Sequence, residues 1–268
     1  MKATIIIPTR SRVETLRYAL MSCTSQDYDD LEIIVSDNFS DDDTKEVVCS
    51  VEDKRVRYVK TPKRISMRQN FEFALSHVSQ GLVGFIGDDD GLMPGAVGRA
   101  VCFAKETGLK ALTSVFSSYR WPSAPSEIRN TGSFQFCRAG DTERSSFRYI
   151  SRALRGTGAY YIHDLPSLYY GFADISLLKS PPKQDFFQSI TPDAYSAFAV
   201  SVQVPSYGYL AKPLFLVGAS GRSNGVSHFF NSADKKESLA FSKENDLVFH
   251  RDYMDCTSIA VYVHEAFR

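Results

Sequence analysis

The chain has 268 residues, of which 43% are hydrophobic and 23% charged, a balance that excludes a disordered or collagen-like protein. Lys plus Arg and Asp plus Glu each number 31, so the formal net charge is zero and no nucleic-acid partner is expected. No apolar run approaches the roughly 18 residues of a membrane span. The five scattered cysteines form no CxxC pair and indicate reduced thiols in a cytoplasmic protein.

Two hydrophobic periodicities alternate along the first half of the chain. Runs of β-branched and other apolar residues predict buried strands at 3–7, 31–36, 55–60 and 82–86. Apolar residues at helical spacing predict a helix after each of three segments: the capping-box patterns at Ser11–Glu14 and Ser66–Gln69, and the polar turn 37–44. This alternation predicts an α/β fold with a mostly parallel central sheet flanked by helices, whose ligands bind at the carboxyl ends of the strands.

The second half is less regular and predicts a smaller acceptor-side subregion with a helical carboxyl-terminal tail. Thr191 is expected to cap a helix that runs to Val202, with Pro192 in its first position. The other expected elements are a long loop or weak hairpin at 117–141, a basic amphipathic helix at 144–155, strands at 159–162, 207–210 and 214–217, and a helical tail from 233. We divide the single continuous domain into residues 1–105, 106–232 and 233–268.

Three adjacent carboxylates, Asp88, Asp89 and Asp90, directly follow the fourth predicted strand. Their mutual repulsion is offset if a divalent cation sits among them, and oxygen ligands suit Mg²⁺ or Mn²⁺. A solvated acidic turn is the alternative, but the position at the ligand-binding edge favours a metal site. The second triplet, Asp41–Asp43, lies at a predicted helix start, where carboxylates complement the helix dipole, so capping is expected there.

Four segments together resemble, in order and spacing, the amino half of family 2 glycosyltransferases, which have the GT-A fold: IIIPTRSR, VSDNFSDDDT, QNFEFAL and GFIGDDDGLMPGA. The likeness covers residues 3–100 well and the rest loosely. It implies transfer of a sugar from a nucleoside-diphosphate donor, by default a UDP-sugar, with inversion at the anomeric carbon. The implied acceptor is a glycan or a lipid-linked oligosaccharide in surface polysaccharide biosynthesis, and peripheral contact with the inner membrane face and a homo-oligomer are also considered.

The same resemblance implies a donor site formed by Pro8, Thr9, Arg10, Asp37, Asn38, Arg68, Asp88 and Asp89. Asp37 would hold the base, Asp90 is the expected direct metal ligand, and Asp88 would lie nearer the ribose or a metal-bound water. The sequence departs from the family's common Ala-Arg-Asn at Met67-Arg68-Gln69-Asn70, which bears on whether Arg68 reaches the donor.

Inversion needs a carboxylate that takes the proton from the acceptor hydroxyl. The family places this base at a helix start, which implies Asp193, with Asp185 in reserve. The alternative for Asp193 is a purely structural complement to the helix dipole. A helix amino terminus is expected to lower the pKa of Asp193 and leave it ionised but weakly basic.

Two residues of the second half are candidates for binding the metal and the diphosphate. His228 is a candidate metal ligand and favours Mn²⁺, although a histidine beside Phe229 and Phe230 is more often simply packed. Arg222 is a candidate for neutralising the diphosphate, with a plain surface arginine as the alternative.

Two other functions stay open from the sequence. One is a GT-A protein that binds a nucleotide or glycan without turning it over. The other is a serine hydrolase, because residues 221–225 match GxSxG. A nucleophile elbow must join a strand directly to a helix, however, and the strand predicted before this segment ends at 217, several residues too early.

Overall fold

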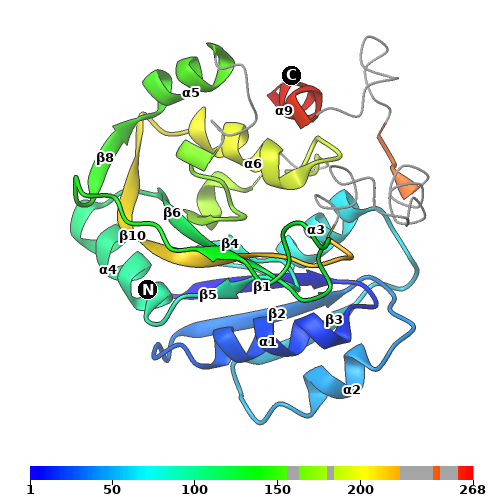
Figure 1. The fold of residues 1–268 in the computed structure, drawn as a ribbon. Coiled ribbons are helices and arrows are strands. Elements are labelled where there is room, and N and C mark those ends of the chain that lie inside the picture. Colours follow the sequence, from blue (N-terminus) through cyan, green and yellow to red (C-terminus); the bar gives the residue numbers. More distant parts are fainter. Residues whose placement is uncertain (156–162, 180–183, 224–243, 248–258, 268) are drawn as a thin grey trace.

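The computed structural model of the protein describes residues 1–155, 163–179, 184–223, 244–247 and 259–267. The strand predicted at 159–162, the candidate ligand His228 and most of the predicted tail lie outside these residues. Within the described part, helices cover both faces of one large mixed sheet (Figure 1).

The first half forms the predicted alternation of strands and helices. Its capping box at Ser66 is present, because the Ser66 hydroxyl accepts from the Gln69 amide at 3.1 Å and the Gln69 side chain accepts from the Ser66 amide at 3.2 Å. The elements are β1 (Ala3–Thr9), α1 (Val13–Thr24), β2 (Leu31–Asp37), α2 (Thr44–Cys49), β3 (Val56–Lys60), α3 (Met67–Leu75), β4 (Leu82–Phe85), β5 (Gly91–Leu92) and α4 (Ala96–Thr107).

The capping box predicted at Ser11–Glu14 is wrong, because α1 begins without a hydrogen bond from a capping side chain of its own. Asp42 supplies the acceptor instead: its Oδ2 accepts from the Val13 amide at 3.0 Å, and its Oδ1 accepts from the Thr44 amide at 3.1 Å. One carboxylate of the second acidic triplet therefore serves the starts of both α1 and α2, which is the capping role predicted for that triplet.

The second half contributes β6 (Ala111–Arg120), β7 (Gly132–Ser133), β8 (Thr142–Ser145), α5 (Ser146–Arg155), β9 (Gly171–Asp174), α6 (Pro192–Ser201), β10 (Ser206–Ala219) and α9 (Ile259–Phe267). The predicted helix 144–155 thus begins two residues later, as α5. The two strands predicted at 207–210 and 214–217 are one strand, β10, with a register shift between Leu210 and Phe215. Pro192 opens α6 as predicted, but the Thr191 side chain makes no capping hydrogen bond.

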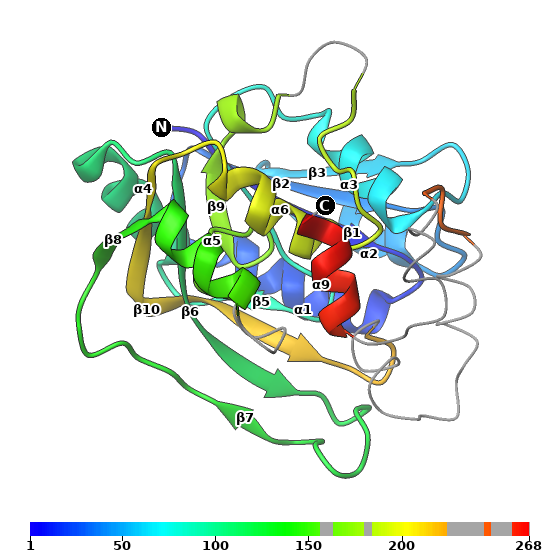
Figure 2. The ribbon, with the colours of Figure 1, turned by 90° about the horizontal axis from the view of Figure 1, so that it is seen from above.

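The strand order of the sheet is β3-β2-β1-β4-β9-β6-β10-β5, with β7 paired to β6 and β8 paired to β10. The first four of these strands are parallel, whereas β9 is antiparallel to both β4 and β6. The predicted α/β class is confirmed, with β9 as the antiparallel link between the two halves. Figure 2 shows the chain from β6 through β7 to β8 running along the outside of the molecule.

Alternate residues of β1 point into two cores, one on each face of the sheet. Ile5 and Ile7 pack with α1 and α4 in one core, whereas Ile6 packs with α3 and the aromatic residues Phe85 and Phe187 in the other. Burial on both faces explains why these strands are continuously apolar. The sheet therefore gives a rigid base to the polar residues that follow β1, β2 and β4.

The helix α9 packs against the second half of the chain. It packs on α6, with the rings of Phe267 and Phe198 5.1 Å apart, and Glu265 accepts a hydrogen bond from Ser189 at 2.9 Å. None of the helices in the described residues combines the length and the apolar character that crossing a bilayer would require.

Candidate active site

A cavity of about 760 Å³ opens at the carboxyl ends of β1 and β4. Residues predicted from four separate segments line it together: Pro8, Thr9, Arg10, Asn38, Asp88, Asp89, Asp90 and Asp193. Parallel strands end at one edge of the sheet, which brings the residues after β1, β2 and β4 side by side. The prediction that ligand-binding residues gather at this edge agrees with the position of the cavity.

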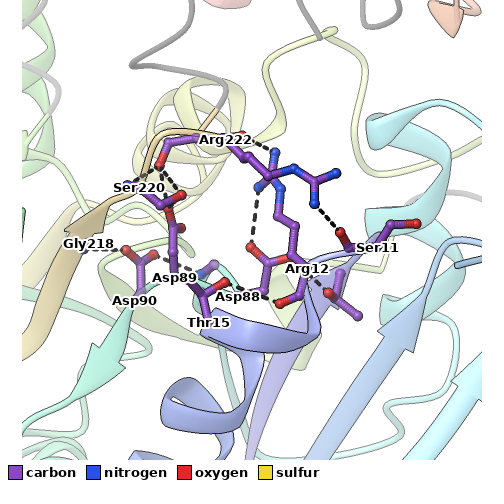
Figure 3. Close-up of polar contacts among 12 residues, drawn as sticks. Ser11, Arg12, Thr15, Asp88, Asp89, Asp90, Gly218, Ser220 and Arg222 are labelled. Atoms are coloured by element: carbon purple, nitrogen blue, oxygen red, sulfur yellow. Dashed lines mark hydrogen bonds and ion pairs between the residues drawn. The ribbon is translucent and has the colours of Figure 1, made fainter. Parts of the chain in front are cut away.

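Asp88, Asp89 and Asp90 are all less than a tenth exposed; residues that end or follow β1 hold Asp88, whereas residues at the end of β10 hold Asp89 and Asp90 (Figure 3). Asp88 accepts from the Thr9 hydroxyl at 2.8 Å and lies 3.2 Å from the Arg12 guanidinium. Burial raises the pKa of Asp88, and the charge of Asp89 raises it further, whereas Arg12 opposes this shift. A solvated acidic turn, the alternative interpretation, does not describe these buried carboxylates.

Asp89 is fixed by the segment that follows β10. Its Oδ2 accepts from the Ser220 hydroxyl at 2.8 Å and from the Ser223 hydroxyl, and its carbonyl accepts from the Trp121 indole at 2.8 Å. Ser223, the central serine of the GxSxG match, thus orients a carboxylate. These hydrogen bonds to Asp89 give residues 220–223 a structural role that does not require hydrolase chemistry.

Asp90 points into the cavity and is bound by neutral donors. Its two carboxylate oxygens accept from the Gly87 amide at 2.8 Å and the Gly218 amide at 2.7 Å, and the Tyr169 hydroxyl also donates to it. Burial, together with the charge of Asp89, raises the pKa of Asp90 to about 7. A buried carboxylate with such partners gains stabilisation from any cation that approaches it.

These carboxylates fit a divalent cation. The described residues contain no group of three or more His, Cys, Asp or Glu side chains that could hold a metal by themselves. Mg²⁺, however, is ordinarily bound by one or two carboxylates together with substrate phosphates, and Asp90 with Asp88 meets that requirement at the cavity wall. The oxygen-only donor set and the raised pKa of both groups agree with this fit.

Asp193 lies in the first turn of α6 and lines the same cavity, to which it is partly open. The expectation that the helix terminus lowers its pKa is wrong: burial raises the pKa of Asp193, and the amides of the first turn offset this only in part. Tyr169 and Tyr170 also line the cavity. Burial raises the pKa of both hydroxyls, and the charges of Asp90 and Asp193 raise it further. A carboxylate with a raised pKa is a stronger base.

Three predicted donor residues do not line the cavity, namely Asp37, Arg68 and Arg222. Asp37 is fully buried and accepts from the Tyr58 hydroxyl and from the Ser40 amide at 2.8 Å. Its neighbour Asn38, which does line the cavity, holds the loop before α3 by accepting from the Ile65 amide at 3.0 Å.

Arg68 and Arg222 both bridge distant segments. Arg68 donates to Asp185 at 2.9 Å, to the Phe187 carbonyl at 2.9 Å and to Asp246. Arg222 donates to the Ser11 carbonyl at 2.7 Å, and its own carbonyl accepts from Arg12, as Figure 3 shows. Arg68, where the sequence departs from the family's Ala-Arg-Asn pattern, thus lies outside the cavity.

Gly218 allows β10 to pass close to the acidic loop. A Cβ atom at this position would lie 1.6 Å from the Asp89 carbonyl oxygen. We therefore expect Gly218→Ala to lower the melting temperature, because β10 must move away from Asp90. The matched control is Gly98→Ala in α4, where a Cβ meets nothing within 4 Å and which should raise stability by up to about 1 kcal/mol. Equal melting temperatures for the two variants would contradict this role of Gly218.

Several residues that build the site were not predicted from the sequence, namely Arg12, Arg120, Gly218, Ser220 and Glu244. No spacing signal in the sequence connects these residues with the site.

Comparisons with known proteins agree with this arrangement. A family model described as Glycosyl transferase family 2 matches residues 4–162, more than half of the chain. The chain belongs to glycosyl transferase family 2. The chain is also similar to a curated protein of Campylobacter jejuni subsp. jejuni serotype O:2, the GalNAc(5)-diNAcBac-PP-undecaprenol beta-1,3-glucosyltransferase. It is 38% identical over 108 residues, which are 39% of this chain and only 35% of the relative.

The fold of this family 2 chain is similar to that of S. aureus TarS. The crystal structure of TarS 1–349 has a TM-score of 0.62 at 16% identity and covers 100% of this chain and 72% of TarS 1–349. Its complex with UDP-GlcNAc has a TM-score of 0.64, also at 16% identity, and covers 100% of this chain and 73% of that chain. At this identity the likeness concerns the fold, and it confirms the predicted GT-A architecture.

Proposed function

We propose that this protein is an inverting glycosyltransferase that uses a nucleoside-diphosphate sugar, with a UDP-sugar as the first candidate. The observation that carries the proposal is one cavity that joins a buried acidic cluster, Asp88–Asp90, to a carboxylate of raised pKa, Asp193. The family supports the class of reaction, and the UDP-GlcNAc complex of the TarS neighbour supports the choice of nucleotide.

The acceptor in this proposal is a lipid-linked glycan, and the pathway is surface polysaccharide biosynthesis. The support is the Campylobacter relative, whose name specifies a glycan on a diphosphate-linked undecaprenol. The hexosyl type of the transfer, a cytoplasmic location, contact with a membrane face and a homo-oligomer belong to the same proposal as predictions. The division into donor half, acceptor half and tail is likewise a prediction.

The chain's own residues would divide the chemistry as follows. Asp193 takes the proton of the acceptor hydroxyl while that oxygen bonds to the anomeric carbon and the bond from this carbon to the phosphate oxygen breaks. The electron pair of that bond leaves with the nucleoside diphosphate. Asp90 and Asp88 would hold Mg²⁺ or Mn²⁺, which when bound neutralises negative charge on the diphosphate. Thr9, Ser220 and Ser223 keep Asp88 and Asp89 oriented.

A thermal-shift screen of nucleotide sugars in Mn²⁺, followed by an assay of nucleoside-diphosphate release, tests this function. A ligand at 100 times its dissociation constant adds about 2.7 kcal/mol of stability, which raises the melting temperature by roughly 5–10 °C. Asp90→Ala should reduce release by about 100-fold or more. The matched control, Asp43→Ala in the exposed second triplet, should leave release unchanged. Full release by the Asp90 variant would contradict the proposal.

The same assays separate the two alternatives. A non-catalytic binding protein would show the thermal shift but consume no nucleotide sugar, and it would be indifferent to Asp193→Asn. A serine hydrolase would cleave esters without a metal and lose that activity in Ser223→Ala. Ser223 donates a hydrogen bond to Asp89, and this contact supports neither the binding protein nor the hydrolase over the transferase.

A further inference from the structure

Two acidic residues of the carboxyl-terminal segment 244–247 bind arginines beside the cavity. Glu244 lines the cavity itself and forms ion pairs with Arg10, which follows β1, and with Arg64, which precedes α3. The Arg64 pair is 2.6 Å long, and the Arg64 side chain is half exposed and lies beside the residues that line the cavity, not among them. Glu244 thus draws together two guanidinium groups from separate segments of the donor half.

Asp246 anchors the same segment to the first turn of α3. It accepts from the Ser66 hydroxyl at 2.6 Å and from Arg68 Nε at 3.0 Å. These hydrogen bonds lower the pKa of Asp246, although burial opposes them, so its carboxylate is charged at neutral pH. The segment is therefore held beside the cavity by charge on both of its acidic residues.

Glu244 is electrostatically unfavourable for the ligand that we propose. Among the described lining residues, the cations are Arg10, Arg12 and Arg120, and the carboxylates are Asp88, Asp89, Asp90, Asp193 and Glu244. Of these cations, Arg12 already faces Asp88, and Arg10 faces Glu244. A diphosphate would bring further negative charge to a cavity in which carboxylates outnumber arginines, and like charges at close range repel.

We propose that Arg10 and Arg64 form an anion subsite for the diphosphate of the donor, and that Glu244 occupies this subsite until the donor displaces it. Asp246 keeps Glu244 in place through Ser66 and Arg68. The inference rests on the proposed function, and it assigns to Arg64 a ligand that no sequence motif indicates. A diphosphate offers the same guanidinium groups oxygen acceptors of greater charge than one carboxylate.

Binding of UDP and of inorganic pyrophosphate, each measured calorimetrically with Mn²⁺, tests the inference. Glu244→Gln keeps the shape of the side chain but removes its charge, and we expect both ligands to bind roughly two- to fivefold more tightly. Asp246→Asn should tighten binding in the same direction, because the segment loses its anchor. Adding Arg64→Gln to Glu244→Gln should cancel the gain. The matched control is Glu32→Gln, since Glu32 also bridges two cations, Lys2 at 2.6 Å and Arg57 at 3.5 Å, away from the cavity.

Equal or weaker binding by Glu244→Gln would overturn the inference, because Glu244 would then be neutral or would help to shape the site. An equal gain in Glu32→Gln would also overturn it, since the effect would reflect net charge alone. Absence of pyrophosphate binding in every variant would exclude the subsite. If wild-type protein consumes a nucleotide sugar while Glu244→Gln binds UDP unchanged, the proposed function survives and only this inference fails.

Discussion

Replacing Asp193 with asparagine is expected to lower turnover by about 10²–10⁴-fold while the affinity for UDP stays within about twofold. Asparagine has the same shape and can stay in the first turn of α6, but it cannot take a proton from the acceptor. The raised pKa of Asp193 strengthens it as a base and also means that turnover should fall as the pH drops through that pKa. Release of nucleoside diphosphate and calorimetric binding of UDP measure the two quantities separately.

Asp185→Asn distinguishes the two candidate bases. Asp185 is half exposed, binds Arg68 at 2.9 Å and does not line the cavity, so its replacement should cost far less turnover than that of Asp193. If Asp193→Asn turns over at the wild-type rate and Asp185→Asn does not, the base has been assigned to the wrong residue. A loss of UDP affinity in Asp193→Asn would instead indicate a structural role at the start of α6.

The sequence predicted the first half of the fold well because its signals are local. Continuous apolar strands such as β1 and β2 are buried on both faces, by α1 and α4 on one side and by α3 on the other. By contrast, β6 carries four Ser or Thr residues, and its pairing with β9 and β10 joins residues that are far apart in sequence. Such a strand is defined by its partners, so neither the whole of β6 nor the continuity of β10 could be predicted from local pattern.

The same distinction applies to the site. Asp88–Asp90 could be predicted because they directly follow a buried strand, and Asp193 was implied by the family resemblance together with its place at a helix start. The groups that orient them could not, since the hydrogen bond between Gly218 and Asp90 spans 128 residues and the pair of Arg10 with Glu244 spans 234. The direction of the pKa shift of Asp193 was missed because burial, which the local sequence does not show, outweighs the amides of the first helical turn.

Asp90 should make the metal-free protein progressively less stable, relative to an Asp90→Asn variant, as the pH rises from 5 to 8. Its pKa is about 7 in the folded protein, against about 3.9 for an unfolded chain. The folded state therefore holds the proton more tightly, and the stabilisation that this gives is present at low pH and is lost as the pH rises through 7. A shift of this size corresponds to a few kcal/mol at most, or roughly several degrees in melting temperature.

The comparison with the variant isolates Asp90 from other titrating groups. Burial lowers the pKa of His77 and of His163, and these histidines make stability rise with pH in wild type and variant alike. Asparagine also loses one acceptor for the Gly87 and Gly218 amides, but that cost does not change with pH.

The melting temperature of Asp90→Asn minus that of wild type, measured in EDTA, should thus increase from pH 5 to pH 8. The difference should shrink when Mn²⁺ replaces EDTA at pH 8, because the ionised carboxylate then has a cation beside it. Asp43→Asn, in the exposed triplet, should show no such trend. A difference that stays constant across this pH range would mean that Asp90 ionises without cost in the folded protein, and the electrostatic reason for placing a cation at the end of β4 would disappear.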